Sequence, residues 1–101
     1  MTPRLVLEPA AQHELADGLA WYEEHSPPKI ANDFLVSVGD TLDRIEASPL
    51  QFAQEHRDVR KAVVPHFPYL ILFIPLPDII AVIAIFHTSR DPAVWIRRAA
   101  G

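Results

Sequence analysis

Residues 67–86, "FPYLILFIPLPDIIAVIAIF", decide the fold of this chain. Two apolar runs, residues 69–74 and 79–86, are rich in isoleucine and valine, which favour strands, and the "PLPD" between them is typical of a turn. About 20 apolar residues are enough to cross a membrane. Three prolines and Asp78 within this stretch argue against a membrane helix. The stretch therefore predicts two buried antiparallel strands joined by a tight turn.

Further strands are predicted on both sides of this pair. The segment "DVRKAVVPHF", residues 58–67, mixes charged and β-branched residues and precedes the pair by a short connection, which favours an antiparallel meander. The segment "RLVLEP", residues 4–9, is predicted to be an opening strand at one edge of the sheet. The strand at 79–86 is apolar on both faces, so we expect it inside the sheet.

Two amphipathic helices are predicted between the opening strand and the meander. The first runs from Pro9 to Glu24, with one apolar stripe formed by Ala11, Leu15, Leu19 and Tyr22. Gly18 lies inside this helix at a cost of about 1 kcal/mol relative to alanine, which indicates that another group packs close to it.

The second helix is predicted to begin with Ser26 as its N-cap and Pro27 as its first residue. It runs to about Ala47, and Pro49 ends it. Its apolar stripe is Ala31, Phe34, Leu35, Val38, Leu42 and Ile45. The short turn between the two helices predicts an antiparallel hairpin that needs an apolar surface to cover.

The predicted fold class is α+β. An N-terminal strand is followed by a two-helix antiparallel hairpin, which packs on an antiparallel sheet of three to four strands. Pro92 opens a short C-terminal segment, "PAVWIRRAA", that is helical or extended. The length of 101 residues predicts one domain, residues 1–101.

The composition excludes several classes of chemistry. The chain has no cysteine, which excludes disulfides, thiolate metal sites and cysteine nucleophiles. The five histidines show no metal-ligand spacing, and the three glycines form no phosphate-binding loop, so no metal and no cofactor are predicted. The N-terminus has no long apolar core, and Glu8 interrupts it, so it is not a secretory signal. We expect a cytoplasmic protein that does not contact a membrane.

Charge is divided unevenly along the chain, whose net charge is −4. Residues 1–50 carry nine acidic and three basic residues, whereas residues 51–101 carry four acidic and six basic residues. An acidic chain is a poor non-specific nucleic-acid binder, and no direct, specific DNA binding is expected. An anionic partner would have to use a local patch in the second half.

A candidate contact surface follows from the basic residues of the second half. If the strand ends share one face of the sheet, the predicted surface brings together Arg60, Lys61, His87, Arg90, Trp95 and Arg97. Arginines there could hold a phosphate or a carboxylate through paired hydrogen bonds.

Simpler roles are open for the same residues. Arg60 and Lys61 could be a solvated strand edge that discourages pairing with other chains. His87 could be a hydrogen-bonded, half-buried histidine, and Trp95 could plug the open end of the sheet.

The chain resembles the RelE/ParE toxin superfamily over nearly its whole length. "AQHELADGLAWYEEHSPPKIANDFLVSV" and "RIEASP" are similar to the helical hairpin of that superfamily. "FPYLILF" and "IAVIAIFHTSRDPAVWIRR" resemble its sheet: an aromatic-Pro-Tyr strand start, then a strand ending in His, two residues, Arg, then Pro and Trp. The order and spacing of these short motifs together are fairly specific.

The resemblance implies that the chain is the toxin of a type II toxin–antitoxin pair, a group that includes plasmid stabilisation systems. Its partner would be a cognate antitoxin. ParE-like members poison DNA gyrase, whereas RelE-like members cut mRNA on the ribosome. RNA cleavage needs a base, a proton donor and cations for the phosphate. RelE-like members resemble strongly basic proteins with several Lys and Arg on the sheet and often a Tyr or His near the C-terminus. Here the net charge is −4, only Arg60 and Lys61 are basic on the early strand, and the tail "WIRRAAG" has no Tyr or His, so the sequence favours the ParE-like function.

Two other functions are open at this point. One is a ribosome-dependent endoribonuclease on the same fold, for which His87, Arg90 and Arg97 are available but no catalytic set can be named. The other is a non-toxic module that only binds an antitoxin.

Overall fold

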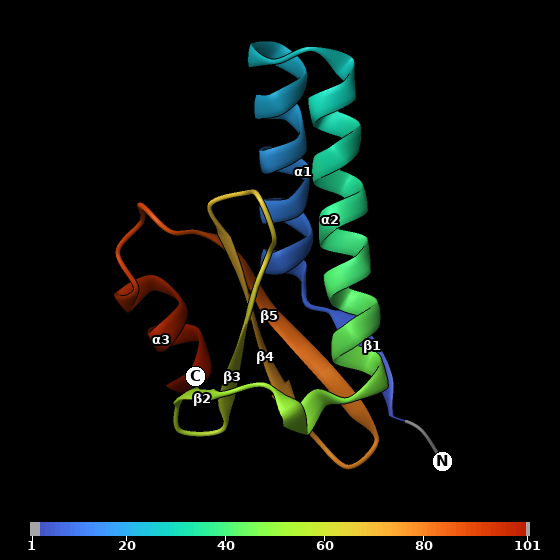
Figure 1. Cartoon of the computed structure of the whole chain (residues 1–101). Coiled ribbons are helices and arrows are strands. Elements are labelled where there is room, and N and C mark those ends of the chain that lie inside the picture. Colours follow the sequence, from blue (N-terminus) through green and yellow to red (C-terminus); the bar gives the residue numbers. More distant parts are fainter. Residues whose placement is uncertain (1–2, 101) are drawn as a thin grey trace.

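The computed structural model describes residues 3–100. In chain order its elements are β1 (Arg4–Leu7), α1 (Pro9–His25), α2 (Pro28–Ala47), a short 3-10 turn (Pro49–Gln51), β2 (Gln54–His56), β3 (Val59–Val63), β4 (Tyr69–Pro75), β5 (Ile79–His87) and α3 (Ala93–Ala100). The predicted α+β architecture is confirmed, and the C-terminal segment is a helix (Figure 1). No helix within the described range is both long and apolar enough to cross a membrane.

The sheet has five strands in the order β1-β5-β4-β3-β2. β3, β4 and β5 form the predicted antiparallel meander, and β1 lies at an edge, parallel to β5. β5 lies between β1 and β4, as its apolar sequence requires, and its residues 80–86 are all buried. The sheet has one strand more than predicted, because β2 is only three polar residues long and shows no apolar alternation.

Each face of the sheet is covered by a different part of the chain (Figure 1). The α1–α2 hairpin packs on one face in a core that includes Phe34, Ile45, Tyr69 and Phe73. α3 packs on the other face, where Trp95 joins Leu72, Phe86 and others in a second core. Because β4 and β5 carry apolar side chains on both faces, the sheet needs the helical hairpin on one face and α3 on the other to keep those side chains from water.

The turn between the helices differs from the prediction at its boundary. Ser26 ends α1, where its N–H donates to the carbonyl of Tyr22 at 2.9 Å, and it does not cap α2. Pro27 is the N-cap of α2 with ψ 154°, and Pro28 is the first helical residue. The reason is steric: a proline disfavours the helical conformation in the residue before it, so Pro28 keeps Pro27 out of the helix.

The apolar stripe of α2 is narrower than predicted. Ala31, Phe34, Val38 and Ile45 are buried as expected, but Leu35 is 40% exposed. Thr41 takes a core position instead, and its hydroxyl donates to the carbonyl of Ser37 at 2.8 Å. Leu35 follows Phe34 directly and so points about 100° away from it around the helix.

Side chains from both helices cover the outer edge of β1. The N–H of Leu5 donates to the carboxylate of Glu46 at 3.3 Å, and the side-chain amide of Gln12 donates to the carbonyl of Leu7 at 2.8 Å. On the inner side, the N–H of Arg4 donates to the carbonyl of Asp78, just before β5, and the N–H of Glu8 donates to Val82 of β5. Two main-chain groups of this edge are therefore already occupied, which makes it a poorer place for another strand to pair.

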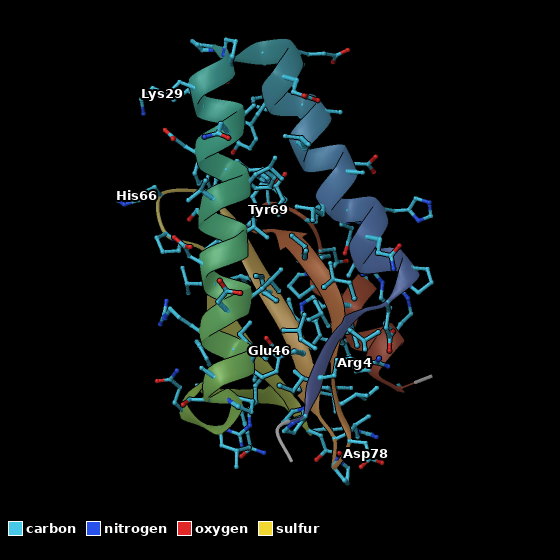
Figure 2. The ribbon with its side chains drawn as sticks, turned by 90° about the vertical axis from the view of Figure 1, so that its right-hand side faces the viewer. Arg4, Lys29, Glu46, His66, Tyr69 and Asp78 are labelled. Atoms are coloured by element: carbon cyan, nitrogen blue, oxygen red, sulfur yellow. The ribbon has the colours of Figure 1, made fainter. Side chains whose placement is uncertain are left out.

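Gly18 is the predicted point of close approach, and the structure identifies its neighbours. A Cβ atom at this position would lie 2.9 Å from the hydroxyl of Tyr69 and 3.1 Å from the Phe34 ring. Figure 2 shows Tyr69 beneath the hairpin, at the end of the sheet opposite Asp78. Both aromatic rings are buried, so they cannot move aside easily.

We expect Gly18→Ala to destabilise the protein by about 1–3 kcal/mol, because overpacking outweighs the gain in helix propensity. Gly39→Ala is the matched control, since a Cβ there meets nothing within 4 Å. That substitution should raise the free energy of unfolding by about 1 kcal/mol. Urea denaturation of both variants measures the difference, and equal stabilisation of the two would contradict the close packing at Gly18.

Candidate functional site

The six predicted contact residues do not form one cluster. Arg60 pairs across the sheet with Phe73, which pairs with Val82, five residues before His87 on β5. This places Arg60 roughly 16 Å along the sheet from His87. Two antiparallel pairings make β3 and β5 run in the same direction, so the start of β3 is level with the start of β5 and not with its end.

Arg60 and Lys61 are instead held by neighbours at the β2 edge. The Arg60 guanidinium donates to the carbonyl of Phe52 at 2.6 Å, and the Lys61 ammonium forms an ion pair with Glu55 at 3.1 Å. Both cations therefore stabilise the connection between α2 and β3 and that edge of the sheet.

His87 lies at the end of β5 and has a defined hydrogen-bonding state. Its Nδ1 accepts the backbone N–H of Ser89 at 3.1 Å and lies 2.7 Å from the Ser89 hydroxyl. Because a backbone N–H can only donate, the neutral ring carries its proton on Nε2. The ring packs edge-on against Tyr69, with centroids 5.1 Å apart.

Arg90 is bound by a carboxylate that the sequence pattern did not single out. It donates to Glu14 of α1 at 2.8 Å, and Arg98 of α3 donates to both oxygens of the same carboxylate at 2.9 and 3.0 Å. The backbone N–H of Ile85 also donates to Glu14, at 3.0 Å. The Glu14 side chain is only 10% exposed, so one largely buried carboxylate connects α1, β5 and α3.

The two remaining predicted residues have opposite environments on α3. Trp95 is 5% exposed and belongs to the second core, where it packs between α3 and the sheet. Arg97 is exposed, and its side chain makes no hydrogen bond or ion pair with any other residue in the range 3–100.

His87 and Arg90 border an open groove of about 600 Å³ between α1 and the ends of β4 and β5. Its α1 wall is formed by Glu14, Asp17, Gly18, Trp21 and Tyr22, and its other wall by Pro68, Tyr69, Ile85, His87, Ser89 and Arg90. Aromatic rings, two carboxylates and two nitrogen donors thus line one hollow, and aromatic residues and arginine are enriched at protein contact sites. We call this hollow the α1–β5 groove.

Sequence reasoning identified two of these groove residues and missed the α1 wall. The contacts of Glu14 could not be found from the sequence, because spacing along a helix does not reveal a partner that is more than 70 residues away. Gly18 was the usable signal, since it marked the turn of α1 that approaches the sheet closely.

Glu14→Gln is predicted to lower the free energy of unfolding by about 2 kcal/mol. The reason is that Arg90 and Arg98, which are both partly buried, lose the carboxylate that they share. Asp33→Asn, which breaks the exposed Lys29–Asp33 pair, is the matched control with an expected loss below about 0.5 kcal/mol. Similar losses in urea denaturation would show that Glu14 has no special structural role.

Burial raises the pKa of the Tyr69 phenol above its ordinary value of 10.0, and Tyr22, Asp17 and Glu14 add to the rise. The unfolded chain therefore loses this proton first as pH increases. Stability should be full below about pH 10 and should fall above it. The decline in urea midpoint at alkaline pH should be shallower in Tyr69→Phe, whereas an unchanged slope would contradict this assignment.

Comparisons with known proteins identify the family of this chain and support its fold. The sequence model described as "ParE toxin of type II toxin-antitoxin system, parDE" matches residues 5–92. A solved structure from P. aeruginosa, titled "Chromosomal ParDE TA system", superposes with a TM-score of 0.76 at 17% identity, covering 85% of this chain and 96% of that one. No curated protein matches. The family match spans most of the chain, and the chain therefore belongs to the ParE toxin family of type II toxin–antitoxin systems.

Proposed function

We propose that this protein is a cytoplasmic toxin that acts by binding a protein target, DNA gyrase, and that a cognate antitoxin neutralises it. Family membership supports the antitoxin partnership. Gyrase as the target rests on the resemblance to ParE-like toxins.

One observation favours a protein target over RNA: three of the four arginine and lysine side chains of the predicted surface are already engaged within the molecule. Arg60 is bound to main-chain carbonyls, Lys61 to Glu55, and Arg90 to Glu14. Binding of a phosphate backbone depends on free cations that neutralise it, and the net charge of the chain is −4. A protein surface can be bound by shape and apolar contact instead.

The second candidate function is an mRNA endoribonuclease, which the geometry at His87 favours. Its Nδ1 is fixed by Ser89, which leaves the Nε2 proton for a reacting oxygen, and Arg90 follows three residues later in the chain. Arg97 is the remaining exposed cation of the predicted set, but it lies on α3 and not on the groove wall.

The deciding experiment is a supercoiling and cleavage-complex assay with purified protein, gyrase and ATP, with and without antitoxin. We expect lost supercoiling or double-strand breaks that the antitoxin reverses. No effect on a gyrase preparation that is active in the control would reject the gyrase mechanism. Cleaved mRNA in a translating-ribosome assay would then support the endoribonuclease, and inactivity in both assays would support the non-toxic module.

Arg90→Ala tests the groove border within the same assay. It should weaken the gyrase effect about tenfold while the fold persists, because Arg98 still occupies Glu14. Lys29→Ala is the control, since Lys29 is an exposed cation at the start of α2, away from the groove. Full activity of Arg90→Ala would remove Arg90 from the contact surface.

A further inference from the structure

The α1 wall of the α1–β5 groove presents an indole ring that is both exposed and held in place. Trp21 is 53% exposed. His25 stacks on one face of its ring, with centroids 4.5 Å apart and planes at 16°, and Tyr22 packs at its edge at 5.2 Å. An exposed tryptophan with an ordered ring gives a partner a large contact area at small entropic cost.

Asp17 adds an available negative charge to the same wall. It lies one helical turn before Trp21, so the two side chains are on the same side of α1. Its carboxylate is exposed and forms no ion pair or hydrogen bond within residues 3–100. Both carboxylate oxygens of the neighbouring Glu14, by contrast, are already paired with Arg90 and Arg98.

Tyr69 supplies an oxygen atom at the floor of the groove. The residue is only 9% exposed, and its hydroxyl has no hydrogen-bond partner among the described residues. Among those residues, no half-buried or buried side chain has an oxygen or nitrogen atom that is both sealed from solvent and unpartnered. The Tyr69 hydroxyl oxygen therefore reaches the groove, where a ligand can bind to it.

We propose that the α1–β5 groove receives an arginine side chain of the protein target, which stacks on Trp21 and donates hydrogen bonds to Asp17 and the Tyr69 oxygen. This inference deepens the proposed function and rests on it for the identity of the partner as a protein. A guanidinium is planar and has several N–H donors, so it can stack on an indole and bind a carboxylate at the same time. A lysine ammonium lacks the plane that this arrangement uses.

The charge distribution supports a basic anchor on the partner. Residues 1–50, which include the whole α1 wall, carry nine acidic and three basic residues. Arg90 lies on the opposite wall and is paired with Glu14 at 2.8 Å, a carboxylate that it shares with Arg98. The incoming cation therefore meets an unpaired carboxylate at Asp17, whereas the cation of the opposite wall is already held by a carboxylate.

The test is an NMR titration of the purified, nitrogen-15-labelled protein with N-acetyl-arginine-N-methylamide. The chain has two tryptophans, one in the groove and one in the second core, so their indole signals serve as reporter and internal control. We expect the Trp21 indole signal to shift and saturate at millimolar ligand while the Trp95 signal stays in place. Equal shifts of both signals, or no shift of Trp21, would overturn the proposal.

Matched ligands and variants separate charge recognition from general contact. The citrulline analogue has the same shape without the charge and should bind at least about tenfold more weakly. Asp17→Asn should weaken arginine binding by a similar factor, and its Trp95 signal reports whether the core is intact. Glu23→Gln makes the same charge change on the other side of the hairpin, in the hollow that contains Leu35, and should bind like the parent protein.

Two results in this series count against the inference: citrulline binding as tight as arginine binding, or unchanged affinity in Asp17→Asn. The titration needs neither gyrase nor antitoxin, so its outcome is independent of the supercoiling assay. A protein that poisons gyrase but does not bind the arginine amide would reject the anchor alone. A protein that binds the amide but leaves gyrase unaffected would reject the target alone.

Discussion

The carboxylate of Glu14 is the contact on which the arrangement of the groove depends. It receives Arg98 from α3, Arg90 from the loop after β5, and the backbone N–H of Ile85. These contacts connect the α1–α2 hairpin to α3 through the end of β5. The sheet needs α3 because its second face is also apolar, with Leu72 and Phe86 packed against Trp95. One largely buried carboxylate thus fixes both a wall of the groove and the position of α3 over the second core.

Much of the fold could be predicted from the sequence because its main signals are local. The strands of β4 and β5, the two helices and the position of β5 inside the sheet follow from apolar runs, periodicity and prolines. β2 could not be predicted, since three polar residues carry no pattern, and its pairing depends on the turn at residues 57–58. The start of α2 was wrong by one residue because two successive prolines restrict each other.

The site was harder to predict because it depends on contacts between residues distant in sequence. His87 and Arg90 were identified from their place after a buried strand, and both border the groove. Arg60 and Lys61 were assigned to the same surface although strand direction separates them from it. Glu14 and Arg98 are 84 residues apart, and no spacing rule connects them. Basic residues in the second half of the chain therefore appear available in the sequence, whereas most of them hold the fold together.

The two sheet edges have different consequences for how copies of this chain can associate. At β1, the side chains of Glu46 and Gln12 occupy outward main-chain groups, whereas β2 is short and irregular. A sheet that can be extended on both sides propagates from molecule to molecule, which is the geometry of fibres. Here the side chains on the β1 edge compete with an added strand for the same main-chain groups, so extension of the sheet from copy to copy is disfavoured on that side.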